Sequence, residues 1–145
     1  MGRGCFCAGV LFVGVLAAMD YHIRFIYEPD VVMLFAPSVI DQGIVIDKGI
    51  HPESILVVNT GDESLLEQLK SNFSFKDIYF VDATRVALDE IGRDIPNSAM
   101  LGALAGTGIV GIDSIAMAIE ENFKKGQGES NARAARSAYE KTQKK

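Results

Sequence analysis

Three short apolar runs, separated by segments with helical periodicity, constrain the fold of this chain most. The runs are Val31 to Phe35, Ser54 to Asn59 and Ile78 to Val81. Each is continuously apolar rather than alternating, which is typical of strands buried on both faces. Glu63 to Asn72 and Ala83 to Ile91 follow two of them with apolar residues at helical spacing. Since parallel strands need such crossovers, the sequence predicts an α/β fold with a parallel, Rossmann-like sheet and flanking helices.

The segment from Ile95 to Gly111 predicts a buried helix that lies close to a neighbouring helix. Pro96 suits the start of a helix, and Asn97 or Ser98 could cap the first backbone donors. Gly102 adds no bulk to the helix surface, so we expect backbone to lie near backbone there.

A glycine motif, G-x-G-x-x-G, ends this segment at Gly106 to Gly111. It matches the dinucleotide fingerprint, but that fingerprint must follow a β-strand. Ser98 to Ala105 is rich in Ala, Leu and Met and prefers a helix. We therefore interpret the motif as a helix end and interhelical turn, with Gly106 or Gly108 at positive φ.

The C-terminal third is predicted to be helical to its end. Ile112 to Phe123 forms an amphipathic helix that closes with a cationic turn, Lys124 to Gly126. Gln127-Gly128 then reads as a short hinge, and Glu129 to Thr142 as the last helix.

The apolar run from Ala8 to Met19 has two interpretations. It resembles the core of a secretory signal, or it forms a buried first helix behind the turn Gly2-Arg3-Gly4. Such a turn would present backbone N–H groups and a guanidinium to an anion. The run is too short to span a bilayer, so we expect no membrane association.

Composition and charge narrow the class of protein. A chain of 145 residues with 48% hydrophobic residues is expected to form a single domain, 1–145. The residues up to Phe123 carry seventeen Asp and Glu against seven Lys and Arg, which argues against nucleic-acid binding. Cys5 and Cys7 form neither a disulfide framework nor a four-ligand metal site, and two free thiols suit a cytoplasmic location. We see no spacing that marks a catalytic acid and base, and no metal site.

Polar residues follow each predicted strand. The three strand ends are Ala36-Pro37-Ser38, Asn59-Thr60-Gly61 and Asp82-Ala83-Thr84. Because ligands of open α/β sheets bind beyond the carboxyl ends of the strands, these residues are candidates for a binding site. Alternatively, they only cap the helices that follow.

A family resemblance covers about Tyr27 to Glu140. The segments YEPDVVMLF, ILVVNT, YFVDATRVALDEIGRDIPNSAMLGALAGTGIV and SNARAARSAYE are similar to the gamma subunit of the 2-oxoacid:ferredoxin oxidoreductases, such as pyruvate synthase. Val81 to Leu104 carries most of the specificity. The N-terminus departs from the family pattern: Gly2 to Cys7 replaces a G-R-G-G-Q-G loop, and Asp20 to Ile26 replaces a longer segment, so the chain looks shortened.

The resemblance implies a noncatalytic subunit in the oxidative decarboxylation of a 2-oxoacid, with pyruvate the expected substrate. Partner alpha, beta and delta subunits would hold thiamine diphosphate and iron–sulfur clusters and pass electrons to ferredoxin. This chain would bind no cofactor alone and would help form the coenzyme A side of the assembled site. A free-standing α/β nucleotide-binding or interaction domain is the alternative. The candidate contacts to coenzyme A are Gly2, Arg3, Gly4, Asn59, Thr60, Asp82, Thr84 and Asn97.

Overall fold

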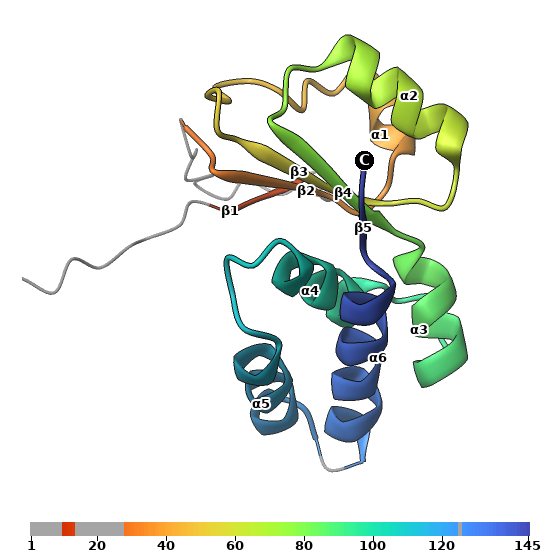
Figure 1. Cartoon of the computed structure of the whole chain (residues 1–145). Helices are drawn as coiled ribbons and strands as arrows, with labels where there is room; N and C mark the ends of the chain where they lie inside the picture. The colour runs from red at the N-terminus through yellow and green to blue at the C-terminus, as the bar shows by residue number, and fades with distance from the viewer. Residues whose placement is uncertain (1–9, 14–27, 125) are drawn as a thin grey trace, which may run out of the picture.

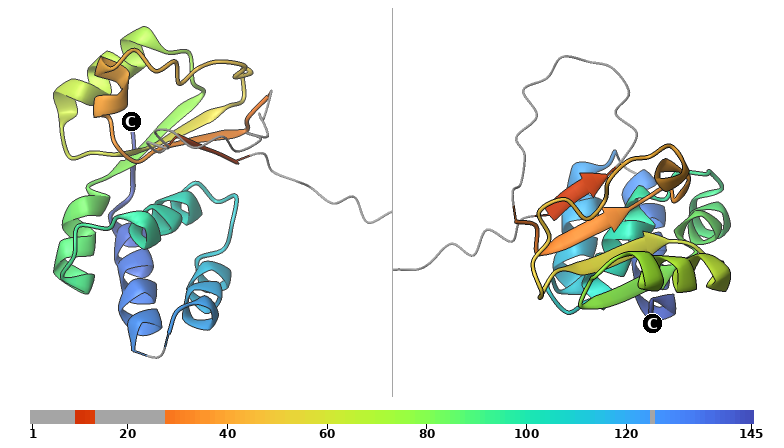
Figure 2. Two further views of the ribbon diagram at one scale, coloured as in Figure 1. Left: turned by 180° about the vertical axis from the view of Figure 1, so that it is seen from behind. Right: turned by 90° about the horizontal axis from the view of Figure 1, so that it is seen from above.

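A five-stranded sheet forms the centre of the protein, for which a computed structural model describes residues 10–13, 28–124 and 126–145. The strands lie in the order β1-β2-β3-β4-β5, and β1 to β4 are parallel (Figures 1 and 2). Only β5 runs antiparallel to its neighbour. This confirms the predicted parallel sheet. The strands are β1 (Val10–Val13), β2 (Val31–Leu34), β3 (Ile55–Asn59), β4 (Asp77–Val81) and β5 (Gln143–Lys144).

Helices cover both faces of the sheet. Helices α1 and α2 lie on one face, and α3, α4 and α6 lie on the other, with α5 farther from the sheet (Figure 1). The architecture is therefore α/β with three layers, as expected for parallel strands. The helices are α1 (Ser38–Asp41), α2 (Glu63–Asn72), α3 (Ala83–Ile91), α4 (Asn97–Gly106), α5 (Ile112–Asn122) and α6 (Gln127–Lys141).

Successive residues of the strands point into two separate cores. Val32 and Leu34 of β2 pack with Leu66 and other residues on the α1–α2 side. Val31 and Met33 pack instead with α3, α4 and α6. Since all four β2 residues are fully buried, the continuous apolar run is explained by cover on both faces.

The helix predicted from Ile95 onward is observed as α4, and it is buried against α6. A Cβ atom built on Gly102 would lie 1.9 Å from the carbonyl oxygen of Ala135. Backbone therefore meets backbone at this contact, as the small residue predicts. The capping prediction is wrong: α4 has no side-chain cap, because the Ser98 hydroxyl donates to Asn131 Oδ1 at 2.7 Å instead.

The glycine motif at Gly106 to Gly111 is a helix end and a turn. Gly106 is the last residue of α4, and Gly108 has φ of +81°. Helix α4, not a strand, comes immediately before the motif, so the dinucleotide fingerprint lacks its required context.

Four sequence expectations about the bounds and types of elements are wrong. Val10–Val13 forms a parallel strand beside β2, not part of a helix. A short apolar run fits either structure, and pairing with a buried strand decides between them. Helix α5 ends at Asn122, before the expected cationic turn, and α6 begins at Gln127 where a hinge was expected. The chain ends in β5 rather than in a helix.

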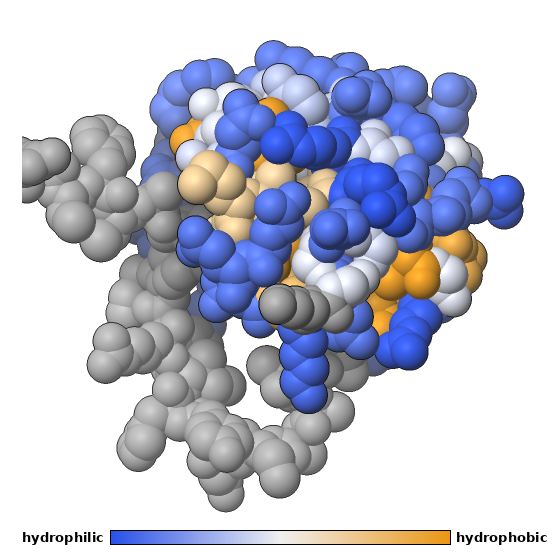
Figure 3. All heavy atoms as spheres, turned by 90° about the horizontal axis from the view of Figure 1, so that it is seen from below, coloured by the Kyte–Doolittle hydropathy of each residue, from blue (hydrophilic) through white to orange (hydrophobic). Residues whose placement is uncertain are grey.

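The surface of the helical layer is largely hydrophilic, with separate apolar patches (Figure 3). One exposed apolar side chain is Met117 of α5, which is 61% exposed. In the described part of the chain, no helix is long and apolar enough to cross a membrane.

Candidate functional site

A cleft of about 600 Å³ lies at the carboxyl ends of the strands. It forms because the chain leaves β3 toward one face of the sheet, into α2, and leaves β4 toward the other, into α3 (Figure 1). Such divergence opens a crevice in α/β sheets. The cleft is lined by Phe35, Ala36, Pro37, Ser38, Asn59, Thr60, Gly61, Asp82, Thr84, Asp94, Pro96 and Asn97.

Asn59 connects the three strand ends behind this cleft. Its Nδ2 donates to the Phe35 carbonyl oxygen at 2.9 Å and to Thr84 Oγ1 at 3.0 Å. Its Oδ1 accepts from the backbone N–H groups of Ala83 at 2.8 Å and Thr84 at 3.2 Å. Both amide hydrogens and the amide oxygen are therefore used within the protein. Asn59 shapes the cleft wall and caps α3, and it leaves little capacity for a ligand.

The N-termini of α2 and α3, which begin at this edge, are also occupied by side chains. Asp82 Oδ1 accepts from the N–H of Arg85 at 2.9 Å, and Asp62 Oδ1 accepts from the N–H of Ser64 at 2.8 Å. An uncapped N-terminus attracts phosphate, but here each carries a carboxylate. The alternative interpretation of the strand-end residues, as helix caps, is thus correct for Asn59 and Asp82.

Another part of the cleft lining comes from the first residue of α4 and the segment before it. Asp94, Pro96 and Asn97 form this part, and Asp94 and Asn97 are exposed. Ser38, also exposed, lies on the α1 side. Among the described residues, the lining holds two carboxylates, Asp82 and Asp94, and no cation. Such a cleft favours neutral or positively charged groups over anions.

The structure brings together five of the eight predicted site residues. Asn59, Thr60, Asp82, Thr84 and Asn97 all line the strand-end cleft. The other three candidates, the turn at positions 2–4, lie outside the described residues.

One site residue that sequence reasoning missed is Asp94. It lies between Arg93 and Ile95, inside the segment Val81 to Leu104 that carries most of the family resemblance. The resemblance indicated the segment, but it could not indicate that the Asp94 side chain lines the strand-end cleft.

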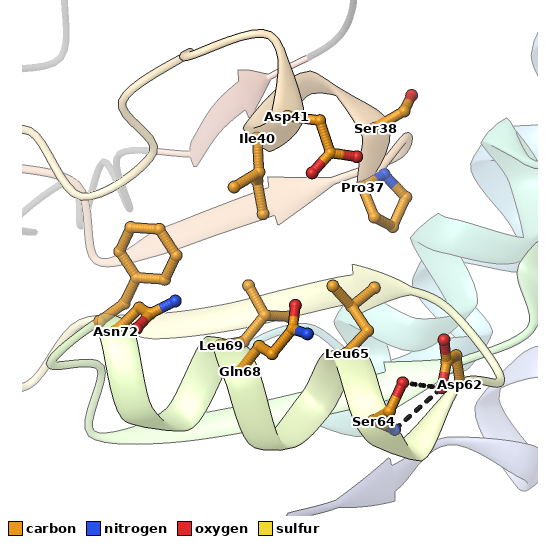
Figure 4. Close-up of a pocket in the computed structure, with 11 residues that line it drawn as sticks. Pro37, Ser38, Ile40, Asp41, Asp62, Ser64, Leu65, Gln68, Leu69 and Asn72 are labelled. Atoms are coloured by element: carbon orange, nitrogen blue, oxygen red, sulfur yellow. Dashed lines mark hydrogen bonds between the residues drawn. The ribbon is translucent and has the colours of Figure 1, made fainter.

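A second cleft of about 320 Å³ separates α1 from α2 (Figure 4). Ile40 on α1 and Leu65 and Leu69 on α2 point into it, with Asp41 and Asp62 at its rim. Asp62 Oδ1 accepts hydrogen bonds from both the backbone N–H and the hydroxyl of Ser64. The cleft thus joins a helix cap, made by Asp62 and Ser64, to an apolar floor.

The Asp62 cap predicts a pH dependence of stability. The Ser64 hydroxyl, then backbone N–H groups, hold the pKa of the Asp62 carboxyl below its ordinary value of 3.8. Its contribution is therefore present above pH 3.8 and is lost as pH falls through the lowered folded-state value. We expect Asp62→Asn, which keeps a capping oxygen, to lose less stability on acidification than the parent chain. Urea midpoints across about pH 5 to 2.5 measure this, with exposed Glu121→Gln as control. An acid response equal to that of the parent would contradict the role.

The site has the chemistry of a binding surface. The strand-end cleft is lined, among the described residues, by amide, hydroxyl and carboxylate side chains and by no His, Cys or Lys. Among the residues that the structure describes, no three His, Cys, Asp or Glu side chains are placed to hold a metal ion. Fold and cleft together define an open α/β-sheet protein with a ligand crevice at its strand ends.

Comparison with known proteins identifies the family. The model of the family "Pyruvate ferredoxin/flavodoxin oxidoreductase" matches residues 9–141, and the chain belongs to that family. The match begins earlier than the resemblance from Tyr27 indicated.

Named relatives and a solved structure support the same family assignment. The pyruvate/ketoisovalerate oxidoreductases common subunit gamma of Pyrococcus furiosus is 48% identical over 121 residues, which are 81% of this chain and 64% of that protein. Pyruvate synthase subunit PorC of Methanothermobacter marburgensis is 40% identical, over 80% of this chain and 62% of that protein. The crystal structure of pyruvate oxidoreductase subunit PORC from Thermotoga maritima superposes with a TM-score of 0.70 and 37% identity, covering 82% of this chain and 66% of that one. This chain thus spans less than two thirds of the length of the two named relatives.

Proposed function

We propose that this chain is a noncatalytic gamma subunit of a 2-oxoacid:ferredoxin oxidoreductase, which decarboxylates a 2-oxoacid oxidatively and forms an acyl-coenzyme A. The observation that carries the proposal is the family match over residues 9–141. The 48% identity to a chain named as a common subunit gamma supports the proposed role within the family. Pyruvate is the expected substrate, since relatives named as subunits of pyruvate synthase match over a similar share of the chain.

In this proposal the strand-end cleft contributes to the coenzyme A side of the assembled active site. Its amide and hydroxyl groups suit the neutral amide arm of coenzyme A, while Asp82 and Asp94 disfavour phosphate there. The contacts proposed within the cleft are Thr60, Thr84 and Asn97, with Asn59 and Asp82 shaping its wall. The turn Gly2-Arg3-Gly4 remains a proposed contact for phosphate.

Partner subunits complete the enzyme in this proposal. Thiamine diphosphate and the iron–sulfur clusters belong to alpha, beta and ferredoxin-like delta subunits in the cytoplasm, with ferredoxin as electron acceptor. A cluster of the common type needs four cysteine ligands, and the whole chain has two cysteines.

We expect the purified chain to show no pyruvate-dependent dye reduction. Co-expressed with candidate alpha, beta and delta subunits from the same genome, it is expected to co-purify with them and to support coenzyme A-dependent activity. A complex assembled without this chain is the control. Activity of the chain alone, or a monomer that does not join any such complex, would contradict the proposal. Tight binding of a dinucleotide by that monomer would favour the alternative of a free-standing nucleotide-binding domain.

A further inference from the structure

A pocket of about 270 Å³ adjoins the strand-end cleft and differs from it in charge. Asn97 lines both, while Asp94 lies in the cleft and its neighbour Arg93 lies in the pocket. In the part of the chain that the structure describes, the pocket lining contains one cation, Arg93, and no carboxylate. The described lining of the cleft has two carboxylates and no cation, so the described side chains favour an anion in the pocket over one in the cleft.

The guanidinium of Arg93 is not engaged in an ion pair within the described part of the chain. The other described arginines are paired: Arg85 with Asp89 at 3.2 Å, Arg133 with Glu90 at 3.5 Å and Arg136 with Asp113 at 2.9 Å. Arg93 is exposed and therefore has its full set of donors available. A free guanidinium is suited to bidentate contact with phosphate or carboxylate.

Two helices begin at this pocket, and neither N-terminus is capped by a side chain. The first residue of α4, Asn97, and the first residue of α6, Gln127, both line it. This contrasts with α2 and α3, whose N-termini carry Asp62 and Asp82. Uncapped N-termini bear partial positive charge, which adds to that of Arg93.

Exposed apolar side chains flank the charged group. Ile95 is 47% exposed and Phe123 is 41% exposed, and both line the pocket. An aromatic ring and an aliphatic side chain beside a guanidinium can pack against a flat, apolar body.

We propose that the Arg93 pocket binds the phosphate-bearing, nucleoside end of a nucleotide-type ligand, with the base against Ile95 or Phe123. Because Asn97 lies in both linings, a long ligand can extend from the pocket into the strand-end cleft. The choice of coenzyme A as that ligand rests on the proposed function, but the anion site itself does not. In this assignment the nucleoside end of coenzyme A lies in the Arg93 pocket, and its neutral amide arm lies in the strand-end cleft.

Calorimetric titration of the full chain tests this with four probes: coenzyme A, adenosine 3′,5′-bisphosphate, adenosine and inorganic phosphate. We expect the bisphosphate to bind more tightly than adenosine or phosphate alone. Arg93→Ala should weaken its binding about tenfold or more, and Arg93→Lys should restore part of it. Arg85→Ala removes the same charge from an arginine outside the pocket and should leave the affinity unchanged. Amide NMR shifts on bisphosphate addition should concentrate at the first turns of α4 and α6.

Several outcomes would overturn the inference. Equal affinity in the parent chain and Arg93→Ala would remove Arg93 from the site, as would a loss caused only by Arg3→Ala. Absence of binding by both phosphate-bearing nucleotides would exclude the pocket as a nucleotide site. Coenzyme A-dependent activity of the assembled enzyme is measured separately. If it persists in Arg93→Ala with an unchanged KM for coenzyme A, the inference fails while the proposed function stands.

Discussion

Replacing Gly102 by alanine is expected to lower the free energy of unfolding by about 3 kcal/mol, at the upper end of the cost of overpacking a core. The added methyl would lie 1.9 Å from the Ala135 carbonyl oxygen and 2.9 Å from its Cα. Since these are backbone atoms, no rotamer change relieves the clash, and α4 and α6 must separate. Urea unfolding followed by circular dichroism measures the change.

The sign of the change in unfolding free energy shows whether Gly102 lies in a tight helix contact or faces solvent. In a solvent-facing helix, Gly→Ala stabilises by about 0.5–1 kcal/mol, because glycine loses more conformational entropy on folding. A raised urea midpoint for Gly102→Ala would therefore show that α4 and α6 are not in backbone contact. Gly61→Ala is the matched control: its added methyl would meet the Asp82 carboxylate at 3.5 Å, an ordinary contact. We expect it to remain within about 0.5 kcal/mol of the parent.

The central strands and their helices could be predicted because local signals agree there with the fold. The observed bounds of α2 and α3 match the predicted ones. Both begin after an aspartate that caps the first turn, and both follow an apolar strand. Local capping and burial thus select the same residues, so sequence alone was sufficient.

The elements that were mispredicted depend on contacts distant in sequence. Gln143 and Lys144 form a strand because β4 offers an edge, with Lys144 also paired to Asp77 at 2.9 Å. Gly128 reads locally as a hinge, but it is buried, and its added Cβ would lie 3.1 Å from Glu120 Cα. In both cases the partner, not the local pattern, determines the structure.

The candidate site, too, could be predicted from the sequence only in part. That Asn59, Thr60, Asp82 and Thr84 converge follows from the parallel sheet alone, since strand ends share one edge. Their division of roles does not follow, because it depends on partners such as the Phe35 carbonyl oxygen, 24 residues before Asn59. Nor could the sequence distinguish Arg93 from the three paired arginines.

Asn59 gives the second large effect that we expect. Asn59→Leu keeps a side chain of similar size but removes all four hydrogen bonds at the strand ends. The Phe35 carbonyl oxygen and the N–H groups of Ala83 and Thr84 then lose their side-chain partner. Leaving a buried polar group unsatisfied costs about 1–3 kcal/mol, and Asn59 is only 9% exposed. We expect a loss of about 3 kcal/mol in the free energy of unfolding, a total limited by water reaching part of the cleft.

Asn97→Ala is the control for Asn59, because Asn97 is exposed on the same cleft and α4 has no side-chain cap to lose. We expect its free energy of unfolding to stay within about 0.5 kcal/mol of the parent. Asn59→Asp separates the two halves of the network: it keeps the oxygen that accepts from Ala83 and Thr84 but loses both donors. If Asn59→Asp is as stable as the parent, the donors contribute nothing. If Asn59→Leu is as stable, the asparagine does not hold the strand ends, and the cleft must owe its shape to the divergence of α2 and α3 alone.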